Sequence, residues 1–163
     1  MLAFRLIAAL WLAVPVLCNA QLTISFPGSD RYADAGADPF EARKNLQEIE
    51  RHLLDLAKRY LPPGQALTIE VLDVDLAGRM RPTRGAGQDV RVMTGGADWP
   101  MIKLRYTLEA GGRTLRSAEE TVSDSDYLQR PSRPGTGEPL YYEKRMLDDW
   151  FKARFGAAEP SRR

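Results

Sequence analysis

The sequence predicts an α+β fold, with two amphipathic helices packed on one face of a mainly antiparallel sheet of four or five strands. Three observations support this prediction. Residues 66–78 alternate between apolar and polar side chains as a buried strand does, two long segments repeat apolar residues at helical spacing, and a Gly-Gly turn joins two further strands. The expected order of elements is β-α-β-(β)-β-β-α, in a single two-layer domain.

Residues 66–78 form the longest run of β-branched and leucine residues after the N-terminal segment, so the other elements are expected to cover it. Apolar and polar residues alternate up to Val71, where the phase reverses. A β-bulge near Val71-Leu72 would return the later apolar residues to the core and leave Asp73 and Asp75 in solvent. In the alternative, both faces of the strand are covered and the two aspartates lie at the rim of a cleft. The bulge is the favoured prediction because buried, unpaired carboxylates are costly.

Two segments have the apolar spacing of helices. The first helix is expected over residues 39–61, with Asp38 as its N-cap, a proline at its first position and Glu41 closing a capping box. The Pro-Pro-Gly run at 62–64 ends it. The second helix is expected over residues 139–156, where aliphatic and aromatic residues form one broad face that points to the core.

Four further segments are predicted strands. Residues 22–26 alternate cleanly, and because a helix follows them, pairing with the central strand would be parallel with a right-handed crossover. Residues 101–109 and 114–123 are expected to form a hairpin through the turn at 110–113. The second strand of this hairpin has the weak pattern of an edge strand. The bracketed short strand is expected over 89–93.

The first 20 residues have the pattern of a cleavable signal peptide. Arg5 precedes a short apolar core, and Ala20 is the small residue before the expected cut, which would make Gln21 the mature N-terminus. The apolar run at 6–17 is shorter than the roughly 20 residues of a membrane-spanning helix. We therefore expect a periplasmic protein with no stable membrane insertion after cleavage.

The mature chain is expected to fold without covalent cross-links. Cys18 is the only cysteine and leaves with the leader; its acylation is the weaker alternative because the preceding Leu17 is bulky. The remaining 143 residues suffice for one domain over 21–156, followed by a disordered tail over 157–163. Removal of the leader's one arginine leaves 22 basic residues against 22 acidic ones. This balance argues against nucleic-acid binding.

Four segments, 71–78, 98–106, 123–128 and 142–151, carry a resemblance to a known family. They read VLDVDLAG, DWPMIKLRY, SDSDYL and YEKRMLDDWF, and together they resemble the bacterial family called domain of unknown function 3016. The resemblance implies a small exported protein of Gram-negative bacteria. It implies no activity.

The familiar catalytic motifs are missing from the sequence. The glycines at 85 and 87 lack the strand, third glycine and helix of a dinucleotide or phosphate-binding loop. His52 is the only histidine and lies beside the apolar stripe of the first helix, where a packed or solvated role is expected. A serine hydrolase or a zinc enzyme therefore has no support. We predict no catalytic residue, no cofactor and no metal ligand.

The leading functional hypothesis is a non-catalytic binding or envelope accessory domain. It would act on an envelope protein or cell-wall component through two long loops, 79–100 and 124–138, because long loops in compact domains are often functional. The candidate binding residues are Asp73, Asp75, Arg79, Arg81, Arg91, Trp99, Asp124, Asp126, Tyr127, Arg145 and Asp149.

The alternative hypothesis is a carboxylate-based hydrolase or a divalent-cation-binding protein centred on Asp73, Asp75 and Asp126. Paired carboxylates cleave glycosidic bonds in many enzymes, and several converging oxygen ligands hold Ca²⁺ or Mg²⁺. A composite cation site requires the fold to bring Asp73 and Asp75 together with Asp124 and Asp126. Otherwise the later pair is expected to form capping or loop hydrogen bonds.

Charges in the second helix allow two arrangements. Lys144–Asp148 and Arg145–Asp149 are spaced for ion pairs on a solvated helix face. In the sharper hypothesis, Arg145 or Asp149 reaches back to fix the loop that contains Asp126 and Tyr127.

Overall fold

The computed structural model describes residues 21–82, 89–131 and 137–156. The predicted leader, the glycines at 85 and 87 and the C-terminal tail lie outside these residues. The elements are β1 (Gln21–Ser25), the 3-10 helix η1 (Ser29–Arg31), α1 (Pro39–Tyr60), β2 (Gln65–Asp75), β3 (Arg79–Pro82), β4 (Asp89–Val92), β5 (Met101–Ala110), β6 (Arg113–Ser123) and α2 (Tyr141–Phe155).

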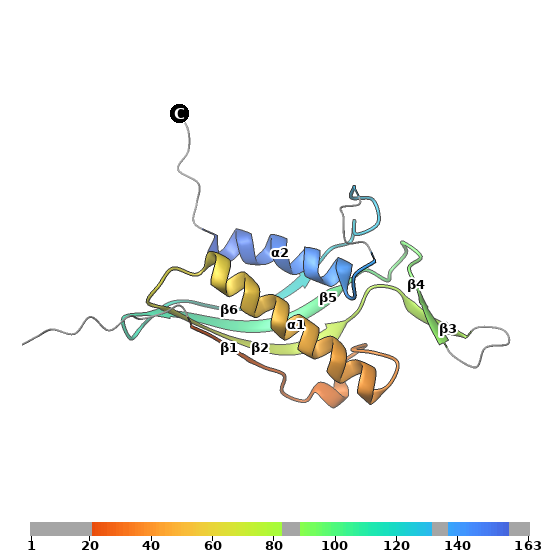
Figure 1. Ribbon diagram of the computed structural model, residues 1–163, viewed down its shortest axis with the longest axis horizontal. Coiled ribbons are helices and arrows are strands. Elements are labelled where there is room, and N and C mark those ends of the chain that lie inside the picture. The colour runs from red at the N-terminus through yellow and green to blue at the C-terminus, as the bar shows by residue number, and fades with distance from the viewer. Residues whose placement is uncertain (1–20, 83–88, 132–136, 157–163) are drawn as a thin grey trace, which may run out of the picture.

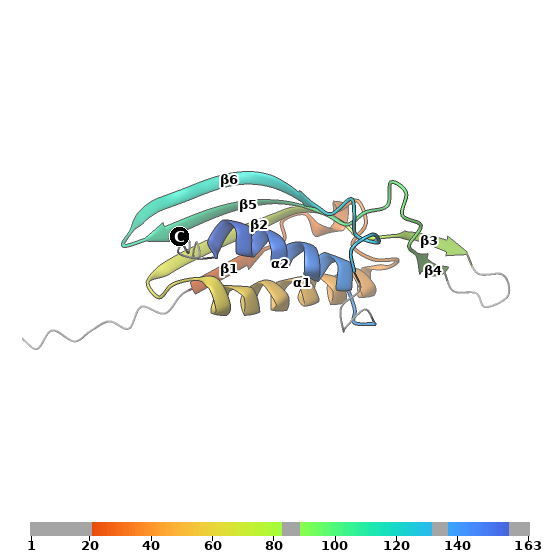
Figure 2. The same cartoon turned by 90° about the horizontal axis from the view of Figure 1, so that it is seen from above.

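The main sheet has four strands in the order β1-β2-β5-β6. The β1 strand runs parallel to β2, with α1 between them in the chain, and the remaining pairs are antiparallel. Both helices lie on the same face of the sheet (Figures 1 and 2). The α+β prediction is confirmed, including the position of β6 at an edge.

The core lies between the sheet and the two helices. Ile69 and Val71 of β2 are fully buried, as are Ile49 and Leu53 of α1 and Phe151 of α2. Each such side chain contributes about 1.5–3 kcal/mol by leaving water. Aromatic rings of α2 continue this packing toward β5 and β6.

The predicted bulge in β2 is present. Val71 pairs with Leu104 and Asp73 with Lys103, so that Leu72 is the extra residue and Val74 returns to the core. The carbonyl oxygen of Val71 accepts a hydrogen bond from the hydroxyl of Tyr32 at 2.6 Å, which satisfies a backbone group beside the bulge.

The two aspartates after the bulge are half-buried, and their predicted full exposure is wrong. The reason is a segment that the sequence pattern did not reveal. Residues 33–35 run along the end of β2, where the Asp34 N–H donates to Val74 and the Leu76 N–H donates to Asp34. Asp73 also accepts a hydrogen bond from the Ala33 N–H at 2.8 Å.

Part of the long connection over 79–100 is regular structure. Its strands β3 and β4 pair with each other in a two-stranded sheet that is separate from the main one. The short strand expected over 89–93 is therefore one arm of a hairpin. Gly78, with a φ of 83°, begins this change of direction, and a Cβ there would lie 2.8 Å from the carbonyl oxygen of Val92.

The first helix begins as predicted. One carboxylate oxygen of Asp38 accepts hydrogen bonds from the Phe40 and Glu41 N–H groups at 2.8 Å each. Glu41 accepts from the Ala37 N–H, one residue before the position that a capping box uses. Within the described residues, neither helix has the length and apolar content needed to span a membrane.

Candidate functional site

The two predicted functional loops meet at one end of the main sheet, at the right of Figure 1. We call this region the loop end; it comprises residues 93–100 and 124–131 together with the β3–β4 hairpin. The Tyr127 hydroxyl donates to Asp98 at 3.0 Å and accepts from the Gly95 N–H at 3.4 Å. These two bonds join the loops across the sequence.

Asp98 is the centre of the loop end. It is only 5% exposed, and it accepts hydrogen bonds from the Thr94 N–H at 2.7 Å and the Thr94 hydroxyl at 2.8 Å, besides the one from Tyr127. Burial acts to raise the pKa of Asp98, but these hydrogen bonds outweigh it and the pKa lies below its ordinary value. The carboxylate therefore stays ionised. Burial, followed by the bond to this carboxylate, raises the pKa of Tyr127.

Arg145 ties the second loop to α2. Its side chain is 6% exposed, and it donates to the carbonyl oxygen of Tyr127 at 2.5 Å and to Asp124 at 3.3 Å. Its guanidinium also lies 5.6 Å and 5.8 Å from the ring centroids of Tyr141 and Tyr142. The hypothesis that Arg145 reaches back to this loop is confirmed.

The ion pairs expected on a solvated face of α2 are replaced by longer-range ones. Lys144 pairs with Glu48 of α1 at 3.3 Å, and Asp148 faces His52 at 3.0 Å. Asp149 pairs with Arg130 at 2.6 Å, and Arg130 also contacts Asp124 at 3.1 Å. The expected i,i+4 pairing was wrong because both helices and the loop offer partners for these side chains.

A second polar network joins β4 to the segment before α1. Arg91 makes a two-pronged ion pair with Asp34, with distances of 2.8 and 2.9 Å. Glu143, only 3% exposed at the start of α2, accepts from the Ala77 N–H at 2.7 Å. Burial raises the pKa of Glu143, and the bond from Ala77 and the charge of Arg91 offset this only in part.

A polar hollow of about 430 Å³ lies beside this network. Its charged lining residues are Asp34, Asp75, Arg79 and Asp98, and its other lining residues are Ala33, Gly78, Met80 and Ala97. Arg79 donates to the carbonyl oxygen of Ala97 at 2.9 Å. Burial, then the charges of Asp34 and Asp73, raise the pKa of Asp75.

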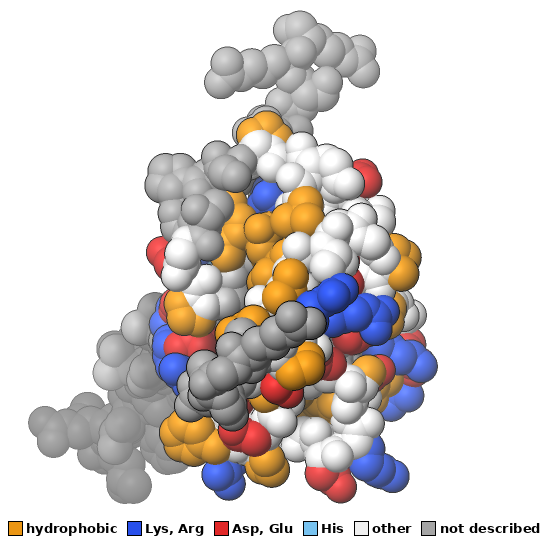
Figure 3. Space-filling view, turned by 90° about the vertical axis from the view of Figure 1, so that its right-hand side faces the viewer, with side chains coloured by type: hydrophobic (Ala, Val, Ile, Leu, Met, Phe, Trp, Pro, Cys, Tyr) orange, Lys and Arg blue, Asp and Glu red, His pale blue; other side chains and the backbone are white. Residues whose placement is uncertain are grey.

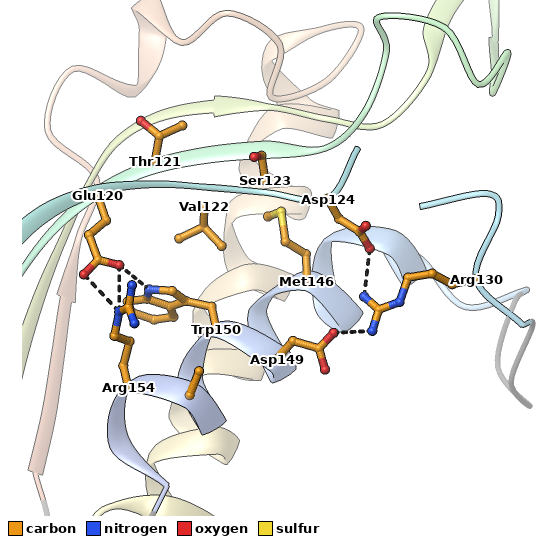
Figure 4. Close-up of a pocket in the computed structure, with 11 residues that line it drawn as sticks. Glu120, Thr121, Val122, Ser123, Asp124, Arg130, Met146, Asp149, Trp150 and Arg154 are labelled. Carbon is orange, nitrogen blue, oxygen red and sulfur yellow. Dashed lines mark hydrogen bonds and ion pairs between the residues drawn. The ribbon is translucent and has the colours of Figure 1, made fainter. Parts of the chain in front are cut away.

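A second hollow of about 330 Å³ lies between β6 and α2 (Figure 4). Val122, Met146 and Trp150 form its apolar part. Glu120 and Arg154 pair at one end of it, and the Asp124–Arg130–Asp149 group closes the other.

The structure separates the candidate residues into distinct groups. Asp124, Tyr127, Arg145 and Asp149 come together at the second loop, while Arg91 is paired with Asp34. Trp99 is 37% exposed next to Asp98, and Arg79, Arg81 and Asp126 are exposed.

The convergence of aspartates that the alternative, a composite cation site, requires is not present in the described part of the chain. Asp73 and Asp75 lie near Asp34, whereas Asp124 is paired with two arginines and Asp126 is exposed. No group of three or more acidic, histidine or cysteine side chains among the described residues is arranged to hold a metal ion. The bulge and the antiparallel strands carry the two pairs of aspartates to different surroundings.

Two buried acids, Glu143 and Asp98, and the half-buried Asp34 were missed by sequence reasoning. Glu143 lies three and four residues before Met146 and Leu147 on the buried face of α2, and this spacing was a usable signal. Asp34 and Asp98 lie in turn-rich segments, where an aspartate is ordinary.

The fold and the loop end thus describe a small α+β protein whose two loops are fixed by buried ionic hydrogen bonds. The chain belongs to the family described as "Protein of unknown function (DUF3016)", whose model matches residues 20–153.

Among solved structures, the chain is similar to a minor lipoprotein from Acinetobacter baumannii. The identity is 10%, over 85% of this chain and 89% of that one, and the TM-score is 0.26. A likeness at this score supports no argument about fold or function. No curated protein matches the sequence.

Proposed function

We propose that this protein is a non-catalytic binding protein of the bacterial envelope and that the loop end is its binding surface. The observation that carries the proposal is the contact between Asp98 and Tyr127, which joins the loops 79–100 and 124–138. Two loops that are held together in this way present one continuous surface to a partner.

Exposed apolar side chains are concentrated in these loops. Of the six large hydrophobic residues exposed in the described part of the chain, Val90, Met93, Trp99 and Leu128 belong to the loop end. Figure 3 looks onto this end, and hydrophobic side chains gather there among charged ones. Aromatic residues and methionine are enriched in protein interfaces, and tryptophan is a frequent hot spot.

The polar network beneath this surface supports the same function. Asp98 and Arg145 are buried and hydrogen-bonded, so they hold the backbone of both loops in one arrangement. A surface that is ordered before binding loses less conformational entropy when the partner arrives. The network is therefore best explained as support for the exposed residues beside it.

The hypothesis of a carboxylate-based hydrolase centred on Asp73, Asp75 and Asp126 gains no support. Such an enzyme needs two carboxyl groups that flank one substrate bond. Asp126 is exposed on the second loop, and the other two aspartates contact residues 33 and 34 on a different segment.

Site-specific photo-crosslinking tests the proposal. A photoreactive amino acid replaces Trp99 in one full-length chain and Lys58 in another; Lys58 is exposed in the last turn of α1. Both chains are expressed in a Gram-negative host that normally carries this protein. We expect a discrete cross-linked product only from position 99.

Two further variants sharpen the result. Tyr127→Phe in the position-99 chain should reduce the product, because it removes the bond that joins the loops. Phe40→Ala, which truncates an exposed aromatic residue outside the loop end, should leave the product unchanged. Equal products from positions 99 and 58, or none from 99, would contradict the proposal.

A further inference from the structure

We propose that the free edge of β6 pairs with β6 of a second copy, so that two four-stranded sheets join into one across a twofold axis. This interface is distinct from the loop end and does not depend on the function proposed above. The β6 strand is the last in the sheet order and is 11 residues long. Figure 2 shows it as the outermost element on its side, with no other element beyond it. One side of its backbone is thus open to pairing.

The charge pattern of β6 is self-complementary about its middle residue, Ala118. In a twofold antiparallel pairing centred there, Arg116 lies opposite Glu120 of the second copy, and the symmetry repeats this pair. The regular part of this overlap runs from Arg116 to Glu120 in each copy. Opposite charges placed directly across two strands stabilise the pairing.

The two charged side chains lie on the same face of the sheet, as cross-strand pairing requires. In the register with β5, Arg116, Ala118 and Glu120 are opposite Leu108, Tyr106 and Leu104, which are all buried toward the helices. Arg116 already points to α2, where it donates to the carbonyl oxygen of Arg154 at 3.0 Å. Leu115 is an extra residue in the pairing with β5, so the regular stretch from Arg116 to Glu120 carries the argument.

Three other symmetric registers are disfavoured by the same charges. Centring the pair on Arg116, Glu119 or Glu120 places like charges face to face on the axis. Charged residues commonly protect an edge strand from unwanted partners. In β6 they exclude these alternatives and leave the register centred on Ala118 favourable.

Glu120 is held as a carboxylate on the face of the sheet that this pairing uses. It accepts hydrogen bonds from the Trp150 indole N–H and the Arg154 Nε–H, both at 3.0 Å. Burial acts to raise the pKa of Glu120, but these bonds and the charge of Arg154 outweigh it and lower the pKa. An arginine from a second copy would thus join an existing ion pair between Glu120 and Arg154.

Sedimentation velocity over a range of concentrations tests the association. The full-length chain and its Arg116→Glu variant are expressed in a bacterial host, and the two purified proteins are compared. Reversal of this charge turns two attractive pairs into repulsive ones, and we expect the dimer dissociation constant to rise about tenfold or more. The matched control is Lys44→Glu, on the exposed surface of α1, which should leave the constant unchanged.

Disulfide trapping tests the register. In a Cys18→Ser background, Ala118→Cys places two thiols on the axis, where Cα atoms of facing residues are about 4.5–5.5 Å apart, within disulfide range. Thr121→Cys places them about 20 Å apart. We expect a covalent dimer from the first variant and none from the second, with thermal melts confirming that both are folded.

Three results would overturn the proposal. The first is a protein that remains monomeric up to about 100 µM, well above the dissociation constants of most specific dimers. The second is a dimer that Arg116→Glu does not weaken. The third is equal cross-linking at positions 118 and 121.

Discussion

Arg145 donates a hydrogen bond to the backbone carbonyl oxygen of Tyr127, 18 residues earlier in the chain, at 2.5 Å. The same guanidinium contacts Asp124 at 3.3 Å. One buried cation on α2 therefore determines the path of the second loop, and through Tyr127 it also determines where that loop meets Asp98.

Replacement of Arg145 by methionine tests this relationship. The apolar side chain has a similar length but leaves Asp124 and the Tyr127 carbonyl with one partner fewer. We expect the free energy of unfolding to fall by about 3 kcal/mol, since breaking a buried ion pair from one side is costly. Urea unfolding followed by circular dichroism measures it. The matched control is Arg43→Met, an exposed arginine of α1, for which a change within about 0.5 kcal/mol is expected.

Tyr127→Phe separates the two loops without removing much volume. The buried carboxylate of Asp98 loses one of its three hydrogen-bond donors, and we expect a loss of about 1–3 kcal/mol of stability. Hydrogen exchange is the more specific measurement, because the Gly95 N–H also bonds to this hydroxyl. We expect faster exchange near Gly95 in the variant, with β2 unaffected. If Gly95 exchanges at the same rate in the variant and the parent protein, the hydroxyl does not join the loops.

Glu143 makes stability depend on pH. Burial raises the pKa of Glu143 above the ordinary value of 4.5. The folded state therefore holds its proton at pH values where the unfolded chain has lost it. The stabilising contribution is complete below the unfolded pKa and is lost as the pH rises through the folded pKa.

Glu143→Gln should flatten this dependence, because the amide keeps an oxygen for the Ala77 N–H and does not ionise. The free energy of unfolding, measured between pH 4 and pH 8, should decline less with rising pH in the variant than in the parent protein. Glu109→Gln, at an exposed position of β5, is the control. Parallel curves for the parent and Glu143→Gln would show that Glu143 does not titrate in this way.

Asp38→Ala removes the cap of α1. The Phe40 and Glu41 N–H groups then lose their acceptor, and the expected cost is about 1 kcal/mol. A thermal melt compared with Asp30→Ala, an exposed aspartate before the helix, measures the difference. Similar melting temperatures for the two variants would assign no stabilising role to the cap.

Local rules were sufficient for much of the fold. The reversal of phase at Val71 predicted the bulge, because only an extra residue returns Val74 to the core. The cap at Asp38 depends on neighbouring residues alone. The weak apolar pattern of β6 predicted an edge strand because few neighbours cover the side chains of such a strand. In the structure, Val122 is the one residue of β6 that is buried.

The missing parts of the prediction depend on contacts between distant segments. Asp34 and Asp75 are 41 positions apart and form a single isolated β-bridge. Asp98 joins the two loops only through its hydrogen bond from Tyr127, which is 29 residues away in the chain. The β3 strand was missed because Arg79 and Arg81 alternate with residues that no core covers, whereas its partner β4 was predicted. Only Glu143, on the buried face of a correctly predicted helix, was within reach.

Leu72 also has a consequence for how β2 tolerates changes in length. Because Leu72 is the extra residue of the bulge, its deletion would leave a regular strand in which Val74 still faces the core and Asp75 still faces away from it. Loss of Leu72 should therefore be tolerated in this family, whereas gain or loss of one residue between Val74 and Leu76 should be avoided, because it turns the side chains that follow to the opposite face. Other variation in length should occur at the two ends of the sheet, where it does not change the side of the sheet to which any side chain points.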